Sequence, residues 1–227
     1  MKHSGKARKA AFRIVFWTLL ALLALLATIV IAMLIGRHAL AIAVSLSVAW
    51  TAFAIFTFCF FRDPEPATPN IPNAIVAPAQ GKVDLIDETT EPEFMGGPCR
   101  RISIFLSIID VHVQRAPISG QLVFHKHKDG QFLSATKTDC GDFNENALLG
   151  FTSTDLAGRK LAVRLIAGLI ARRINVWTQT GDIATRGELI GLIQFGSRAH
   201  LYLPLDAKIH VKLGDRVKVG ETLVASF

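Results

Sequence analysis

The sequence predicts a mainly β domain with one core helix, preceded by a transmembrane helical hairpin. Residues 14–35 and 39–61 form two apolar runs without a charged side chain. Beyond residue 74, short runs of branched and aromatic residues alternate with Gly, Pro and Asp, which is typical of strands and turns. A hydrophobic fraction of 51% and a mean hydropathy of +0.39 are high for a soluble chain of 227 residues.

Both apolar runs are long enough to cross a bilayer, whose core of about 30 Å needs roughly 20 helical residues. Because only residues 36–38 separate the runs, the chain is expected to turn at the far face and return. A cleavable signal peptide is the alternative for the first run, but its apolar part is usually shorter, at about 7–15 residues. Residues 1–61 are therefore predicted to form a membrane anchor with two transmembrane helices.

The net charge of +7 belongs to the anchor and its flanks. Seven Lys and Arg residues precede Asp63, the first acidic residue, and from there on 18 basic residues meet 18 acidic ones. A neutral folded domain gives no indication of nucleic-acid binding. Five of the seven basic residues precede the first span, so the positive-inside rule places both flanks, and the β domain, on the cytoplasmic side of the inner cell membrane.

Prolines at positions 64, 66, 69 and 72 predict a stiff connector over residues 62–76, followed by the folded domain over residues 77–227. One core helix is expected from Lys160 to Val176, since apolar residues recur there near a 3.6-residue period with arginines opposite. The clearest strands are Ile102–Ile109, Gln121–His125 and Leu201–Leu203.

Two glycine-punctuated segments, Ala77–Val83 and Ile209–Val224, resemble the strands of biotinyl and lipoyl carrier domains. Gly214 and Gly220 are expected to adopt positive φ, and alternate residues such as Leu213 to enter a small barrel core. The resemblance implies a carrier-like β-sandwich or barrel. The Met-Lys-Met attachment hairpin of a carrier is missing, so the chemistry is expected elsewhere.

Gly196 and Ser197 lie between two apolar runs that should form neighbouring strands. Glycine leaves its carbonyl open to approach and tolerates a strained backbone. A hydroxyl held against that carbonyl can attack it and move the Gly196 acyl group from nitrogen to oxygen. Elimination of the ester leaves dehydroalanine, which hydrolyses to a pyruvoyl group. On the dipeptide alone, an ordinary turn is the simpler interpretation.

Four blocks of sequence favour the reactive interpretation. In chain order they resemble the short, archaeal-type pyruvoyl-dependent phosphatidylserine decarboxylases. The two predicted transmembrane helices at the N-terminus resemble the membrane anchor of that family. The resemblance implies a proenzyme that cleaves itself at 196/197 into a large chain (1–196) and a small chain (197–227). The blocks are Phe61–Pro64, Ala77–Val83, Ile104–Gly120, and Phe195–Arg198 with Tyr202–Pro204.

The same resemblance implies a carboxy-lyase that converts phosphatidylserine to phosphatidylethanolamine. Its cofactor is the covalent pyruvoyl group derived from Ser197, which takes up electrons when carbon dioxide leaves, and no metal is expected. The expected partners are phosphatidylserine, the bilayer and the small chain, with a second copy of the chain as an option and no nucleic acid.

Several residues are candidates for the remaining roles. His112 is expected to donate the proton, since an imidazole with a pKa near 6.5 both gives and takes protons at neutral pH. Arg115 and Arg198 are candidates for binding the phosphate or carboxylate of the substrate. Glu145 belongs to the segment Asp142–Asn146, which resembles an Asn-Glu loop near the active site of the family.

The chain departs from the family at three positions. Gln80 replaces an acidic residue, Arg115 replaces the second histidine of the self-cleavage relay in longer relatives, and His200 stands where an acidic residue is common. The base for Ser197 is therefore expected to be His112 or else His200, with Asp84 as a stand-in acid.

Two other classes of function are kept as alternatives. A non-enzymatic, membrane-anchored, carrier-like adaptor would have the same architecture and an intact chain. A metallopeptidase using His112, His125 and His127 would need a metal, but no third ligand follows the last two at a telling spacing. Three scattered cysteines, Cys59, Cys99 and Cys140, indicate neither a disulfide framework nor a zinc site.

Overall fold

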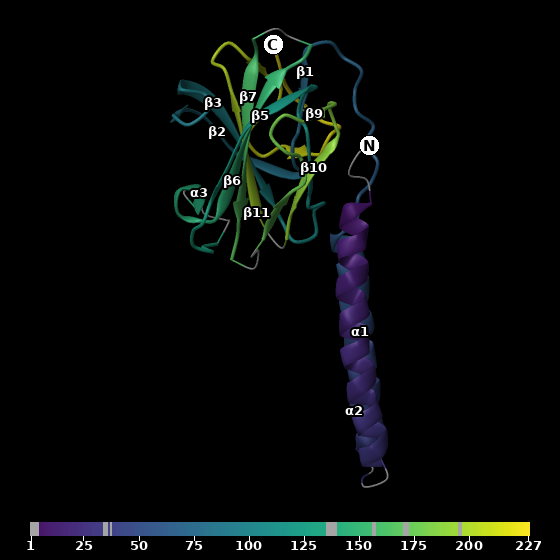
Figure 1. Ribbon diagram of the computed structural model, residues 1–227. Helices are drawn as coiled ribbons and strands as arrows, with labels where there is room; N and C mark the ends of the chain where they lie inside the picture. Colours follow the sequence, from purple (N-terminus) through teal and green to yellow (C-terminus); the bar gives the residue numbers. More distant parts are fainter. Residues whose placement is uncertain are drawn as a thin grey trace. The chain divides into compact units, whose positions relative to one another are not determined.

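The computed structural model divides the chain into a helical unit, Gly5–Asp63, and a β unit that begins at Pro64 and ends at Phe227 (Figure 1). It describes residues 5–33, 36, 38–134, 140–155, 158–169, 173–194 and 197–227.

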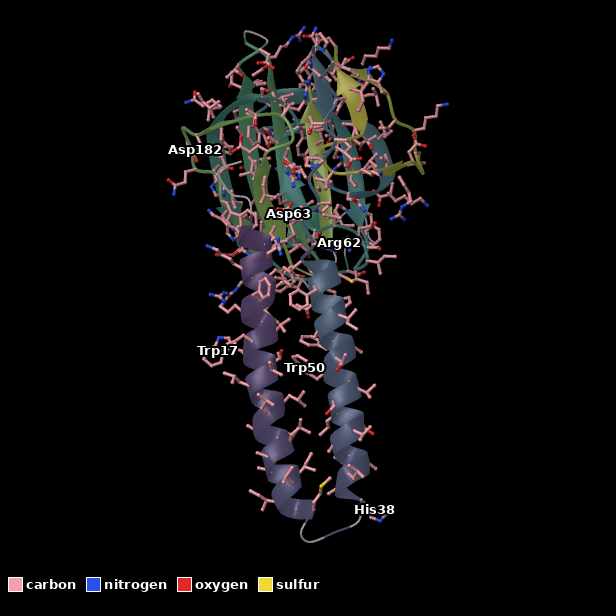
Figure 2. All side chains as sticks on the ribbon, turned by 90° about the vertical axis from the view of Figure 1, so that its right-hand side faces the viewer. Trp17, His38, Trp50, Arg62, Asp63 and Asp182 are labelled. Atoms are coloured by element: carbon pink, nitrogen blue, oxygen red, sulfur yellow. The ribbon has the colours of Figure 1, made fainter. Side chains whose placement is uncertain are left out.

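The helical unit consists of α1 (Lys6–Met33) and α2 (Ala39–Phe60), which confirms the predicted pair of helices. Both are long and apolar enough to cross a membrane. The Trp50 indole donates a hydrogen bond of 3.3 Å to the Thr18 hydroxyl of the other helix. Figure 2 shows Trp17 projecting away from the pair, with His38 at one end and Arg62 at the other.

The described part of the β unit is built from one curled eight-stranded sheet and two three-stranded sheets, in which neighbouring strands run antiparallel (Figure 1). The large sheet has the order β13-β2-β3-β11-β7-β6-β5-β9, and the small sheets have the orders β1-β14-β12 and β4-β10-β8. A four-residue helix, α3 (Cys140–Phe143), precedes β6. The strands are β1 (Ala74–Val76), β2 (Gly81–Glu91), β3 (Gly97–Leu106), β4 (Val113–Arg115), β5 (Gly120–Lys128), β6 (Asn146–Ser153), β7 (Lys160–Ala167), β8 (Ile174–Val176), β9 (Ile183–Ala184), β10 (Leu189–Ile193), β11 (Ser197–Leu203), β12 (Lys208–Ile209), β13 (Arg216–Val217) and β14 (Leu223–Ser226).

The predicted core helix over Lys160–Val176 is wrong, because this segment forms β7 and β8. β7 is buried on both faces: Leu161 and Leu165 enter the main core, whereas Ile166 packs on the opposite side. A strand buried on both faces carries apolar residues without alternation, so its spacing resembles that of a buried helix. Ile170 and Arg172, which contributed to the predicted pattern, lie outside the described residues.

The C-terminal glycines behave as expected. Gly214 and Gly220 have φ values of +97° and +73°, in the region that favours residues without a Cβ. Val211 and Val217 are buried as predicted, but Leu213 is 68% exposed and does not enter the core.

Two arginines fasten the proline-rich segment to the strands of the β unit. Arg115 donates to the Pro64 carbonyl at 3.0 Å. Arg186 donates to the carbonyls of Pro69 and Ile71, each at 2.9 Å. The start of the β unit is therefore held by charge-assisted hydrogen bonds and is not a free linker.

Candidate active site

Ser197 is the first residue of β11, in the middle of the large sheet. It pairs with Leu106 of β3 on one side and with Ala167 of β7 on the other. Its side chain is fully buried, and among the described residues its hydroxyl has no hydrogen-bond partner. A buried hydroxyl without a partner is costly, so this serine is a candidate for chemistry. Gly196, the other half of the predicted cleavage point, lies outside the described residues.

The chain crosses between two sheets twice at this point. Residues 107–112 lead from β3 to β4, and residues 194–196 lead from β10 back to β11. The strands on both sides of the crossings are paired, Ser197 with Leu106 and Leu192 with Val113. Ser197 and Leu192 are thus each paired with a strand at one end of the segment that carries His112.

Hydrogen bonds fix His112 next to this crossing. The ring is fully buried, and its Nδ1 lies 2.9 Å from the Asp110 carbonyl oxygen. Because a carbonyl only accepts, Nδ1 carries the proton, and in the neutral ring Nε2 is then free of a proton. The His112 carbonyl accepts the Ile193 amide at 3.2 Å and the Gln114 side-chain amide at 2.8 Å. The imidazole is therefore held in the tautomer that a general base needs.

The segment around Glu145 borders the other neighbour of Ser197. The Asn144 side chain donates to the Ala167 carbonyl at 2.7 Å, and the Glu145 carbonyl accepts the Ala167 amide at 2.9 Å. The Glu145 carboxylate lies 3.5 Å from Nε2 of His127. The side chains of Cys140 and Asp142 lie outside the described part of the chain.

Arg198 forms an ion pair with Asp84, whose side chain is 23% exposed, on the opposite face of β11 from Ser197. The guanidinium is fully buried, lies 2.7 Å from Oδ1 of Asp84, and also donates to the Ser103 hydroxyl. Since successive side chains of a strand point to opposite faces, Arg198 does not face the same side as Ser197. It is engaged by protein groups and is not a surface charge.

His200 also lies on this opposite face. Its Nδ1 is 3.2 Å from the Tyr202 hydroxyl, and the ring is 2% exposed. Burial, together with the charges of Arg101, Arg198 and Arg164, holds the pKa of His200 well below its ordinary value. The structure thus places the segments of His112 and Glu145 beside the strands that flank Ser197, but places His200, Asp84 and Arg198 on the other face of the sheet.

Arg115 serves the fold, with its guanidinium bonded to the carbonyls of Gly187 and Pro64. The sequence interpretation missed Gln114 and Asn144, two fully buried amides that fix His112 and Ala167. Their only sequence signal is a polar residue inside or beside a short apolar run. Among the described residues, no group of three or more His, Cys, Asp or Glu side chains is arranged to hold a metal ion.

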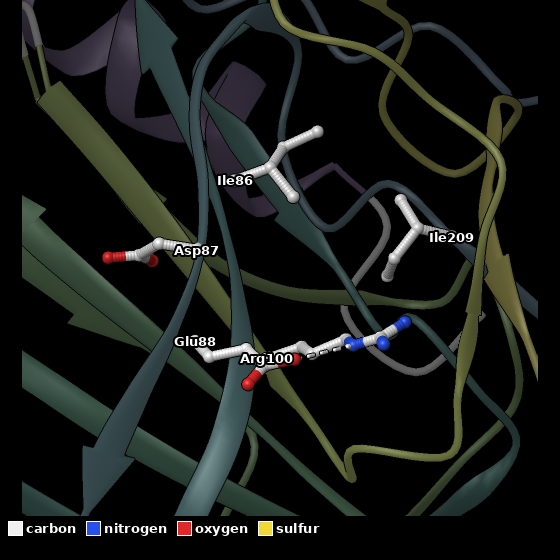
Figure 3. Close-up of a pocket in the computed structure, with 5 residues that line it drawn as sticks. All are labelled: Ile86, Asp87, Glu88, Arg100 and Ile209. Atoms are coloured by element: carbon white, nitrogen blue, oxygen red, sulfur yellow. Dashed lines mark ion pairs between the residues drawn. The ribbon is translucent and has the colours of Figure 1, made fainter.

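A separate pocket of about 190 Å³ lies at the far end of β2 and β3 (Figure 3). Arg100 in this pocket pairs with Leu203, six residues along β11 from Ser197, or about 20 Å at the rise of a strand. It is therefore not part of the Ser197 site. The pocket is lined by Ile86, Asp87, Glu88, Arg100 and Ile209.

The ion pair of Asp84 and Arg198 leads to a prediction on stability. Asp84→Asn removes the charge that Asp84 presents to a fully buried guanidinium, and we expect the free energy of unfolding to fall by about 3 kcal/mol. Denaturant titration measures this loss. Asp87→Asn is the matched control, because Asp87 and its partner Arg101 are 32% and 21% exposed, and its expected cost is below about 1 kcal/mol. A folded Asp84→Asn protein that no longer processes itself would instead give Asp84 a role in the chemistry.

A protein family and several known proteins align with most of this chain. The family model described as phosphatidylserine decarboxylase matches residues 53–225, a range that contains His112 and Ser197. The phosphatidylserine decarboxylase proenzyme of Desulfotalea psychrophila is 43% identical over 169 residues, covering 74% of this chain and 78% of that protein. The proenzyme of Symbiobacterium thermophilum is 41% identical over 180 residues, with coverages of 79% and 83%. The proenzyme of Ruegeria pomeroyi is 40% identical over 181 residues, with coverages of 78% and 82%.

Proposed function

Because the chain belongs to the phosphatidylserine decarboxylase family, we propose that it is a self-cleaving, pyruvoyl-dependent enzyme that converts phosphatidylserine to phosphatidylethanolamine. The observation that carries the proposal is the buried hydroxyl of Ser197, which has no hydrogen-bond partner among the described residues and lies on the strand that follows the segment bonded to His112. The adaptor interpretation is not favoured, since relatives that align with three quarters of the chain are named proenzymes.

Self-cleavage would use groups of the chain itself. The Ser197 hydroxyl attacks the Gly196 carbonyl carbon, and His112 takes up the hydroxyl proton through Nε2. The C–N bond breaks as the C–O bond forms, so an ester replaces the peptide. Removal of the Cα proton then expels the carboxylate of Gly196 and leaves dehydroalanine at position 197. Addition of water and loss of ammonia complete the conversion to pyruvoyl.

The residues around position 197 suit a pyruvoyl group. When present, it supplies an electron sink for the bond that breaks as carbon dioxide leaves. Leu106 and Ala167 flank the position and are fully buried, so water is kept from the carbanionic centre. His112 then supplies the proton that replaces the lost carboxyl group.

We further assign this chain to the short subtype, since the aligned bacterial proenzymes are covered over about four fifths of their length. Residues 1–61 would anchor it in the inner membrane, with the β unit on the cytoplasmic side. The excess of basic residues before the first helix supports this orientation.

Mass spectrometry of the purified full chain tests the proposal. We expect two chains, 1–196 and 197–227, the second lighter by one ammonia than a peptide that begins with serine and resistant to Edman degradation. Carbon dioxide should be released from carboxyl-labelled phosphatidylserine. An intact chain with an ordinary serine at position 197 and no gas release would overturn the assignment.

A further inference from the structure

Exposed apolar side chains gather at the end of the β unit that carries Ser197. The register of the large sheet brings Leu106, Ser197, Ala167 and Asn146 to one end, so the segments that leave or enter these strands there are neighbours. Three of these segments carry large apolar side chains that are 38–71% exposed. They form what we call the apolar rim: Ile108, Ile109, Leu133, Phe143 and Leu169.

The conformation of the first segment exposes its apolar side chains. Ser107–Asp110 is a tight turn closed by the Asp110 amide on the Ser107 carbonyl at 2.9 Å, and the Asp110 carboxylate accepts the Ser107 amide at 2.9 Å. Its two central residues are Ile108 and Ile109, 46% and 71% exposed. Central turn positions usually hold Gly, Pro, Asn or Asp. Two isoleucines there need an explanation from outside the fold.

Hydrogen bonds tie the other two segments to the same place. The Leu133 amide donates to the Asn144 side chain at 2.8 Å, so Leu133 lies beside the end of α3 that carries Phe143. The Gln194 amide donates to the Arg173 carbonyl at 3.2 Å, and Leu169 lies two residues beyond Ala167, the β7 partner of Ser197. Arg173 itself is exposed.

Scattered exposed apolar residues are normal on a protein surface, but five around one site are not explained by chance exposure. Other exposed ones in the β unit lie elsewhere, such as Ile183 on edge strand β9 and Leu205 after the far end of β11. A rim of this kind, with a cation beside it, suits the interface of a bilayer that contains anionic lipid.

We propose that the apolar rim inserts into the lipid surface from which the substrate is drawn. The inference rests on the proposed function, since a diacyl substrate stays in the bilayer and has to reach a serine that is fully buried. Three residues join the end of α2 at Phe60 to Pro64. So short a tether keeps the β unit at the membrane, whereas the rim determines which end of the unit meets the lipid.

The double variant Ile109→Glu/Leu169→Glu of the full chain in nanodiscs tests this inference. Carboxylates resist entry into the interface, so we expect kcat/KM for bilayer phosphatidylserine to fall about tenfold, the effect of roughly 1.4 kcal/mol. Turnover of a short-chain phosphatidylserine supplied as soluble monomers should be unchanged, and so should self-cleavage. The matched control is Ile183→Glu/Leu205→Glu, whose positions are 66% and 43% exposed and whose activity on both substrates should match the unmodified chain.

Each other result has a definite meaning. Equal activity of the rim variant and the unmodified chain on bilayer substrate would overturn the inference. An equal loss on both substrates would also overturn it, and a lower oligomeric mass in the same variant would identify the rim as an interface between copies. If the unmodified chain decarboxylates neither substrate, the proposed function fails before the rim is tested.

Discussion

Ser197→Ala is expected to leave the protein as a single uncut chain and to abolish decarboxylation completely. Without the hydroxyl, the Gly196 carbonyl has no neighbouring nucleophile, and no precursor of the pyruvoyl group exists. Denaturing gels and mass spectrometry follow the cleavage, and release of labelled carbon dioxide follows the activity. Ser226→Ala is the control, because Ser226 lies on β14 with its hydroxyl 2.8 Å from His210, and this variant should process and react normally.

The structure allows this loss to be assigned to chemistry. The Ser197 hydroxyl is buried and has no hydrogen-bond partner among the described residues, so its removal breaks no hydrogen bond within that part of the chain and relieves an unsatisfied group. We therefore expect the variant to unfold at the same denaturant concentration as the uncut precursor or at a higher one. Cleavage of the Ser197→Ala chain at 196/197 would contradict the proposed mechanism.

His112→Asn is expected to lower kcat by about 10² to 10⁴, the usual range for a lost general acid or base. The substitution is chosen because an asparagine amide can still donate to the Asp110 carbonyl, which Nδ1 does at 2.9 Å in the unmodified chain. The segment should thus keep its position while Nε2 is removed. Self-cleavage should slow as well, and single-turnover release of carbon dioxide from cleaved protein measures the second role separately.

His200→Gln is the matched control for that variant. His200 lies on the other face of β11, and the lowered pKa keeps its ring neutral, so an uncharged side chain of similar length replaces it with little change in electrostatics. We expect cleavage and turnover to stay within about threefold of the unmodified chain, a difference of less than 1 kcal/mol. If His200→Gln stops cleavage and His112→Asn does not, the base acts from the opposite face.

Local patterns in the sequence were sufficient for part of the fold. Charge-free runs defined both helices, and glycine positions defined turns such as those at Gly214 and Gly220. The segment Lys160–Val176 was wrongly predicted as a helix. The spacing of apolar residues shows which positions are buried, and a strand covered on both faces can be buried at every position. Whether such a segment is helix or strand depends on neighbours that are distant in the chain, such as β11 for β7.

The candidate site, like the fold, could be predicted only in part from the sequence. Ser197 and His112 were predicted from their motifs; strand pairing and hydrogen bonds link the segments that carry them, and their roles stay predictions. The pairing of Arg198 with Asp84 joins residues 114 positions apart and has no local signature. The separation of His200 from Ser197 was within reach of the sequence, because three residues along a strand reverse the face. Gln114 and Asn144 could not be found, since their importance lies in the carbonyls that they bind.

The position of β11 has a consequence for the processed protein. Residues 197–227 supply β11 to the middle of the large sheet, β13 to its edge, and β12 and β14 to a second sheet. Once the bond before Ser197 is cut, the product is an interlaced heterodimer whose smaller member is threaded through the larger one. Maturation thus turns a first-order folding reaction into a second-order one, and an enzyme that has been fully denatured reassembles at a rate set by its concentration.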